Sequence, residues 1–164
     1  MINRVCWALI IVILSVPAGL AGASETDVVS GAGIAVIVNT DNPVDQLSLA
    51  DLQRIVLGER RSWSARIPLV LMMRNVGSRE RILLLQKACH MTDAEYHQYW
   101  TEKIFRGEVT SEPVALPSMG TAVNFVSSIK GGISFVDAAS VRPGIKVIRI
   151  DGHLPGEQGY PLSN

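Results

Sequence analysis

The sequence has few cysteines, few aromatic residues and no net charge. Of its 164 residues, two are cysteines and 5% are aromatic, and the formal net charge at pH 7 is +0. Without a basic excess, the chain has no long-range field to attract nucleic acid or an anionic membrane, so any recognition of charge must be local. The sequence also lacks a Walker loop, a dinucleotide-binding glycine motif and a nucleophile elbow. We therefore expect no enzymatic activity and no cofactor.

The first 23 residues have the pattern of a secretory signal peptide. Arg4 precedes an apolar block at 5–16, and 21–23 read Ala-Gly-Ala, which is a cleavage-site pattern. An uncleaved anchor is the alternative, but the block is shorter than the roughly 20 residues that span a bilayer. We expect residues 1–23 to be removed and residues 24–164 to form one domain in the periplasm, with no membrane span after cleavage.

The two cysteines cannot form a disulfide in the mature chain, because Cys6 lies within the predicted signal peptide. Cys89 is then the only thiol of an exported domain, whose stability must come from its core. Cys89 lies in the apolar run LLLQKACH. This context predicts that Cys89 is a small buried hydrophobic residue rather than a nucleophile.

Short apolar runs alternate with amphipathic segments along residues 33–151. Hydrophobic periodicity, serine and threonine caps and glycine stops predict both kinds of element. The expected strands are 33–39, 66–73, 112–116, 133–137 and 145–151, and the expected helices are 48–58, 78–90, 92–107 and 118–131. This alternation predicts an α/β three-layer sandwich with a central, mostly parallel or mixed sheet. The tail from Asp151 is rich in turn residues and is expected to be irregular.

The segment from Arg74 to Arg79, read RNVGSR, joins a predicted strand to a predicted helix. Backbone N–H groups in the first turn of a helix have no internal partner, and the helix dipole adds partial positive charge there. Gly77 would let an anion approach the backbone, Ser78 could donate its hydroxyl, and Arg74 could offer two parallel donors. The alternative is an ordinary strand-to-helix turn with Ser78 as its cap, and these residues alone favour that alternative.

Other residues that could carry chemistry are weaker candidates. The three histidines have no metal-ligand spacing, so no metal site is expected. Three early aspartates fall in turns and a cap, which does not indicate paired-carboxylate catalysis. Three aromatic residues at helical spacing could stack on a ligand, but core packing is the favoured reading. These residues are His90, His97 and His153; Asp41, Asp45 and Asp51; and Tyr96, Tyr99 and Trp100.

Four ordered segments resemble the phosphate-binding proteins of bacterial phosphate importers, which have the type 2 periplasmic binding fold. The segments are IAVIVNTDNPVDQLSLADLQRIVLGERRSW, IPLVLMMRNVGSRERILLLQKA, TAVNFVSSIKGGISFVDAAS and DGHLPGEQGYPLSN. They extend over 33–164. The resemblance implies an oxyanion ligand, with phosphate as the first candidate. It favours the interpretation of this segment as an anion-binding site over its interpretation as an ordinary strand-to-helix turn.

By position, the resemblance places the family's phosphate-binding arginine on Arg74 and its helix-start serine on Ser78, with Gly77 shaping the turn. Two departures follow. The family has glycine and threonine after the serine, whereas this chain has Arg79 and Glu80. Arg79 could add positive charge and is included in the expected site. Glu80 suits the helix dipole but would repel a nearby phosphate unless it points away.

The second departure concerns size, because family members have two lobes that clamp the ligand and this chain resembles the second lobe alone. A single wall leaves the anion open to solvent, which weakens electrostatic contacts. The implied partners are an ABC permease, a sensor protein or a second copy of the chain, and nucleic acid is not among them. The alternative function is a ligand-free interaction or sensing module that keeps the fold. An enzyme is the least favoured class.

Overall fold

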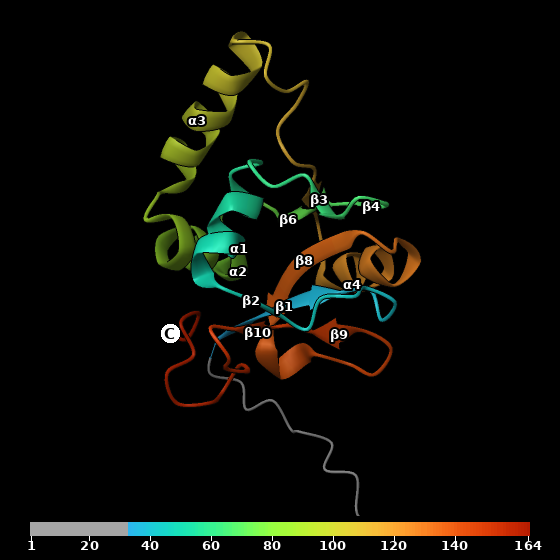
Figure 1. Cartoon of the computed structure of the whole chain (residues 1–164). Coiled ribbons are helices and arrows are strands. Elements are labelled where there is room, and N and C mark those ends of the chain that lie inside the picture. Colours follow the sequence, from blue (N-terminus) through green and yellow to red (C-terminus); the bar gives the residue numbers. More distant parts are fainter. Residues whose placement is uncertain (1–32) are drawn as a thin grey trace, which may run out of the picture.

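The computed structural model describes residues 33–164, so the predicted signal peptide lies outside the described residues. Within that part, a four-stranded sheet has the strand order β5-β8-β1-β9 (Figure 1). Its strands are β1 (Ile34–Val38), β5 (Val70–Leu71), β8 (Gly132–Asp137) and β9 (Lys146–Val147). The β1 strand is antiparallel to both β8 and β9, and β5 is parallel to β8. The predicted mixed sheet is confirmed, although antiparallel pairing prevails.

The β1 strand is buried on both faces and separates two hydrophobic cores. Ile34, Val36 and Val38 belong to the larger core, while Ala35 and Ile37 belong to the smaller one. All five side chains are fully buried. Since side chains alternate across a strand, a run of consecutive apolar residues is what a central strand covered on both faces requires.

Helices pack on both faces of the sheet, which confirms the three-layer α/β sandwich. On one face lie the helices of the larger core, and α4 packs on the opposite face (Figure 1). The helices are α1 (Leu49–Val56), α2 (Arg79–Leu84), α3 (Asp93–Phe105) and α4 (Met119–Ser128). The α2 helix continues as a π-helical turn, η1 (Leu85–Cys89), and a 3₁₀ turn, η2 (Ala138–Ser140), follows β8.

Each helix begins at the residue that its capping pattern predicted. Ser48, Ser78, Thr92 and Ser118 are the N-caps, and the side chain of each accepts a hydrogen bond from a backbone N–H three residues later. At Thr92 the complete capping box is present, because the carboxylate of Glu95 accepts from the Thr92 N–H at 2.7 Å. These bonds satisfy donors that the helix itself leaves unpaired.

The predicted strand over 66–73 is divided into three short strands, which corrects that prediction. They are β4 (Ile67–Pro68), β5, and β6 (Met73–Arg74). Each pairs with a different partner: β4 with β3 (Ser62–Ser64), β5 with β8, and β6 with β7 (Ala115–Leu116). A run of apolar residues does not specify partners, so it cannot show where a strand changes neighbour.

The α3 helix extends from the body of the domain and is anchored to α1 by its aromatic residues (Figure 1). The hydroxyl of Tyr96 donates to the Val56 carbonyl at 3.0 Å. The hydroxyl of Tyr99 and the ammonium of Lys103 both donate to the Leu57 carbonyl, at 3.0 Å each. The predicted core role of the aromatic residues is confirmed, since they close the C-terminal end of α1.

Two short strands complete the fold. They pair in parallel, and the C-terminal segment from Asp151 has no regular strand or helix. The strands are β2 (Gln46–Leu47) and β10 (Arg149–Ile150). Across residues 33–164, no helix has both the length and the apolar character needed to cross a membrane.

Candidate functional site

The predicted anion-binding segment, residues 74–79, joins β6 to α2 at the surface of the domain. Gly77 adopts φ 81°, which favours glycine, and a Cβ placed there would meet nothing within 4 Å. The Ser78 N–H donates to the Asn75 carbonyl at 3.1 Å and closes the turn. The Ser78 hydroxyl oxygen accepts from the Arg81 N–H at 3.4 Å. The space beside the Gly77 Cα is therefore unfilled by the described residues.

Arg74 lies beneath this turn rather than beside its surface. One guanidinium nitrogen, Nη1, donates to the Leu116 carbonyl on β7 at 2.9 Å. Its Nε is 3.9 Å from the Glu80 carboxylate and is buried without a hydrogen-bond acceptor among the described residues. The side chains of Arg74 and Glu80 are 11% and 12% exposed. Glu80 thus points toward the arginine that the sequence assigned to the anion.

Arg81 is a residue whose place the sequence did not predict. Arginine in a helix normally lies on the solvent face, but the Arg81 side chain is only 2% exposed. Its Nε donates to Asp93 at 2.5 Å, its Nη2 to Glu112 at 3.2 Å, and its Nη1 to the Arg74 carbonyl at 3.4 Å. The guanidinium also lies over the Tyr96 ring at 5.2 Å. Arg81 therefore joins the 74–79 segment to α3 and to the connection before β7.

The carboxylate of Asp93, at the start of α3, occupies the turn. One oxygen accepts from Arg81, and the other accepts from the Gly77 N–H at 3.4 Å. The sequence analysis gave Gly77 the role of letting an external anion approach the backbone at this turn. A bound oxyanion at this N–H would have to displace the Asp93 carboxylate or lie close beside it.

Arg79 faces a different side of the segment from Arg74. Its guanidinium contacts the Asp137 carboxylate at 2.5 Å and the Asn164 side-chain oxygen at 2.6 Å. Gly77 and Arg79 line a shallow depression of about 310 Å³ together with Ile82, Leu83, Gln86 and Asn164. Arg74 does not line it. The structure therefore brings Gly77 and Arg79 to one depression, which neither Ser78 nor Arg74 lines.

Each arginine of this region has a carboxylate partner. Arg74 is near Glu80, Arg79 near Asp137, and Arg81 near Asp93 and Glu112. Opposite charges at this distance cancel most of the positive potential that would attract a dianion. That the 74–79 residues bind an anion stays a prediction, and these internal pairs limit its expected affinity.

The position of Asp93 beside Gly77 could be predicted only in part from the sequence. The Thr92 capping box locates the start of α3 and hence places Asp93 in its first turn. Nothing local indicates that this turn packs against Gly77, which is 16 residues away in the chain. Hydrophobic periodicity also cannot predict a buried arginine inside a helix, because arginine normally lies on the solvent-exposed face.

The other candidate residues have structural surroundings. Cys89 is buried, as predicted, and desolvation raises the pKa of its thiol to about 12. His97 contacts the Glu112 carboxylate at 3.0 Å, and His153 lies 4.0 Å from Glu157. His90 ends the π-helical turn in a left-handed conformation. Within residues 33–164, no group of three or more His, Cys, Asp or Glu side chains could hold a metal ion.

No protein-family model and no curated sequence matches the chain. Solved structures with the same fold are a putative phosphate ABC transporter substrate-binding protein with bound phosphate from Clostridium perfringens and an ABC-type phosphate transport receptor from Vibrio cholerae. The first is 21% identical with a TM-score of 0.62, and the match covers 76% of this chain and 47% of that one. The second is 19% identical with a TM-score of 0.66, and the match covers 80% and 53%.

A third structure, PstS from Borrelia burgdorferi, is 12% identical with a TM-score of 0.63, and the match covers 81% of this chain and 55% of that one. The chain thus spans about half the length of the solved proteins that it resembles. At these identities the likeness establishes a shared fold.

Proposed function

We propose that this chain is a periplasmic oxyanion-binding protein, with phosphate as its first candidate ligand, and that the ligand binds at the 74–79 segment. The observation that carries the proposal is the exposed turn at Gly77, where a Cβ would meet nothing within 4 Å, on a fold shared with phosphate-binding proteins. The backbone at Gly77 and the Ser78 hydroxyl would contact the oxyanion directly. Arg79 would contribute from the rim, and Arg74 would contribute charge from beneath the turn.

The internal carboxylates set the strength of this proposed binding. Asp93 shares the Gly77 N–H, and Glu80 lies 3.9 Å from Arg74. An incoming phosphate must therefore overcome repulsion from two acids at a site that solvent reaches. We expect a dissociation constant in the micromolar to millimolar range rather than the tight binding of a closed cleft.

The proposed location and partners follow from the same reading. Export through the 1–23 signal peptide would place the protein in the periplasm, where small oxyanions are available. The ligand-bound protein could then interact with an ABC permease, a sensor protein or a second copy of the chain. The solved structures with this fold are named as binding proteins, which accords with a role other than catalysis.

Calorimetry of the mature chain with phosphate and with sulfate tests the proposal. Binding should be detectable at millimolar ligand and should weaken in the Ser78→Ala and Arg79→Ala variants. The matched control is Arg66→Ala, which removes an exposed arginine outside the 74–79 segment. No heat with either anion would refute the proposal, and equal affinity in Arg79→Ala and Arg66→Ala would remove Arg79 from the site.

A second candidate function is a ligand-free interaction or sensing module. The specific observation in its favour is that Asp93 already fills the turn and that every arginine of the region faces a carboxylate. In this case the acids replace the anion and keep the site structured without a ligand. Pull-down from periplasmic extract with and without phosphate separates the two functions. A stable partner whose capture ignores phosphate supports the module, whereas capture that requires phosphate contradicts it.

A further inference from the structure

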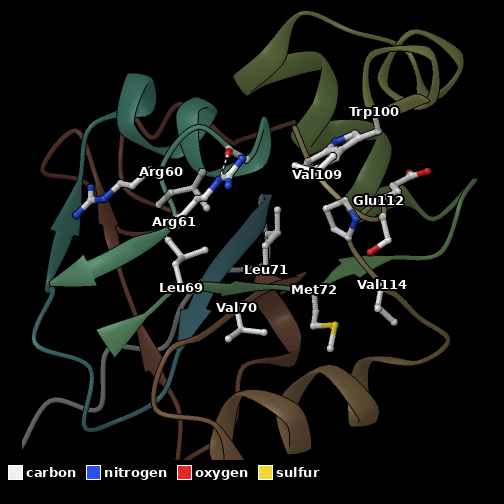
Figure 2. Close-up of a pocket in the computed structure, with 14 residues that line it drawn as sticks. Arg60, Arg61, Leu69, Val70, Leu71, Met72, Trp100, Val109, Glu112 and Val114 are labelled. Atoms are coloured by element: carbon white, nitrogen blue, oxygen red, sulfur yellow. Dashed lines mark hydrogen bonds between the residues drawn. The ribbon is translucent and has the colours of Figure 1, made fainter. Parts of the chain in front are cut away.

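A cavity of about 360 Å³ lies along β5, apart from the 74–79 segment (Figure 2). Apolar side chains from β5, α3 and the connection before β7 form most of its wall. Those lining residues include Leu69, Leu71, Met72, Trp100, Val109 and Val114. The size is typical of sites for small molecules, and the lining is typical of them as well.

The floor of this cavity is an unpaired piece of sheet edge. Val70 and Met72 direct their N–H groups to β8, donating to the Gly131 and Ile133 carbonyls at 2.9 and 3.1 Å. Because alternate residues of a strand direct their backbone groups to opposite sides, Leu71 faces away from β8. Among residues 33–164, no group pairs with the N–H or the C=O of Leu71.

The chain itself limits the length of what could pair there. On the same outer edge, the Leu69 N–H donates to the Arg61 carbonyl at 2.9 Å, and the Met73 N–H donates to the Val114 carbonyl at 3.1 Å. The gap between these two bonds covers four residue steps, or about 13 Å of extended chain. A long strand would collide with both flanking segments, whereas two or three extended residues fit between them.

The two ends of the cavity carry opposite charges. Arg60 and Arg61 lie at the end near Leu69, and Glu112 lies at the other end (Figure 2). Arg61 donates to the Gly58 and Glu108 carbonyls, and no carboxylate of the described residues lies within 4.0 Å of it. Glu112 accepts one bond on each oxygen, so each oxygen keeps a second lone pair.

We propose that this cavity binds a short zwitterionic peptide of two or three residues, running antiparallel to β5. In an antiparallel hydrogen-bonded pair, two opposite residues exchange both N–H···O bonds, which is what the free groups of Leu71 require. The antiparallel direction also places the peptide's carboxylate near Arg61 and its ammonium near Glu112. An apolar central side chain would pack against the cavity wall. This ligand class is independent of the oxyanion at the 74–79 segment.

Titration of ¹⁵N-labelled chain with Ala-Leu-Ala tests the proposal through the Leu71 amide resonance. Saturable shifts at Leu71 are expected at millimolar peptide, and they should persist in the presence of phosphate. Methylation of the central peptide nitrogen removes the donor to the Leu71 carbonyl, and it should abolish the shifts without altering the protein. No shift at Leu71, or equal shifts with the methylated peptide, would overturn the proposal.

Variants then test the polarity of the site. Arg61→Ala should weaken the zwitterionic peptide by about fivefold, the size of one partly exposed ion pair, and should leave its amidated form unchanged. The matched control is Arg54→Ala on α1, whose side chain is 59% exposed and does not line the cavity. Equal weakening of both peptide forms by Arg61→Ala would contradict the orientation. Tighter binding of long extended peptides would show that the edge serves protein docking instead.

Discussion

Replacing Asp93 with asparagine should strengthen phosphate binding while weakening the fold. Asp93 holds the Gly77 N–H and the buried Arg81 at once, so the substitution affects both the proposed site and the packing between α2 and α3. Asparagine keeps the size of the side chain and one acceptor oxygen. It removes the negative charge that a phosphate on Gly77 would face.

The expected gain in affinity follows from the geometry. A phosphate oxygen sharing the Gly77 N–H would lie about 4 Å from the carboxylate, where two unit charges repel by about 4 kcal/mol at an effective dielectric of about 20. Asp93 is 22% exposed, and solvent reduces such a pair toward the roughly 1 kcal/mol of surface charges. A gain of about 1–2 kcal/mol corresponds to an affinity about 5- to 30-fold higher.

The expected loss of stability has the same origin. The ion pair between Arg81 and Asp93 becomes a bond from a charged guanidinium to a neutral amide oxygen, and the favourable charge in the first turn of α3 is lost. We expect the free energy of unfolding to fall by about 1–2 kcal/mol, which lowers Tm by about 3–7 °C for a domain of this size. Calorimetric titration and thermal unfolding measure the two effects on the same sample.

Glu112→Gln is the matched control, because Glu112 is the other carboxylate on Arg81 and does not contact Gly77. It should lower Tm in the same way and change phosphate affinity much less. If both variants change the affinity equally, competition at the Gly77 N–H is not the cause. If Asp93→Asn binds phosphate more weakly than the unmodified chain, the reasoning is refuted.

Three further predictions concern the fold. Gly58→Ala should destabilise more than Gly107→Ala: both glycines have positive φ, at 67° and 71°, but a Cβ on Gly58 would lie 2.5 Å from the Trp100 ring and one on Gly107 would meet nothing within 4 Å. We expect about 1 kcal/mol from backbone strain at Gly107 and at least twice that at Gly58, measured by urea unfolding; equal losses would exclude the Trp100 contact. The Cys89 thiol, whose pKa burial raises to about 12, should not react with a thiol reagent at pH 8 until the chain unfolds, and rapid labelling of the folded chain would contradict its burial. Hydrogen bonds in the capping box lower the pKa of Glu95, so its stabilisation is complete above the unfolded value and is lost as pH falls through the lower folded value; Glu95→Gln should flatten the pH dependence of stability in this range, and an unchanged acid-unfolding profile would show that the box contributes nothing.

Much of the fold could be predicted because the deciding interactions are local. A serine or threonine N-cap accepts hydrogen bonds from backbone N–H groups within the first turn of its own helix. The consecutive apolar residues of β1 indicate that both faces of this strand are covered. The caps at Ser48, Thr92 and Ser118 and the strand β1 were accordingly confirmed. The division of 66–73 into three strands was not predictable in this way, since it depends on which distant segment each pair of residues meets.

At the candidate site too, local interactions could be predicted from the sequence and contacts between distant segments could not. The sequence by itself determined that a turn with an exposed glycine and a capping serine joins β6 to α2, because backbone geometry and capping act over a few residues. Only the tertiary structure decided that Arg81 is buried, that Glu80 turns toward Arg74, and that Asp93 reaches Gly77. Those contacts require α3 to pack against the start of α2, and packing between elements is set by the shape of the whole core.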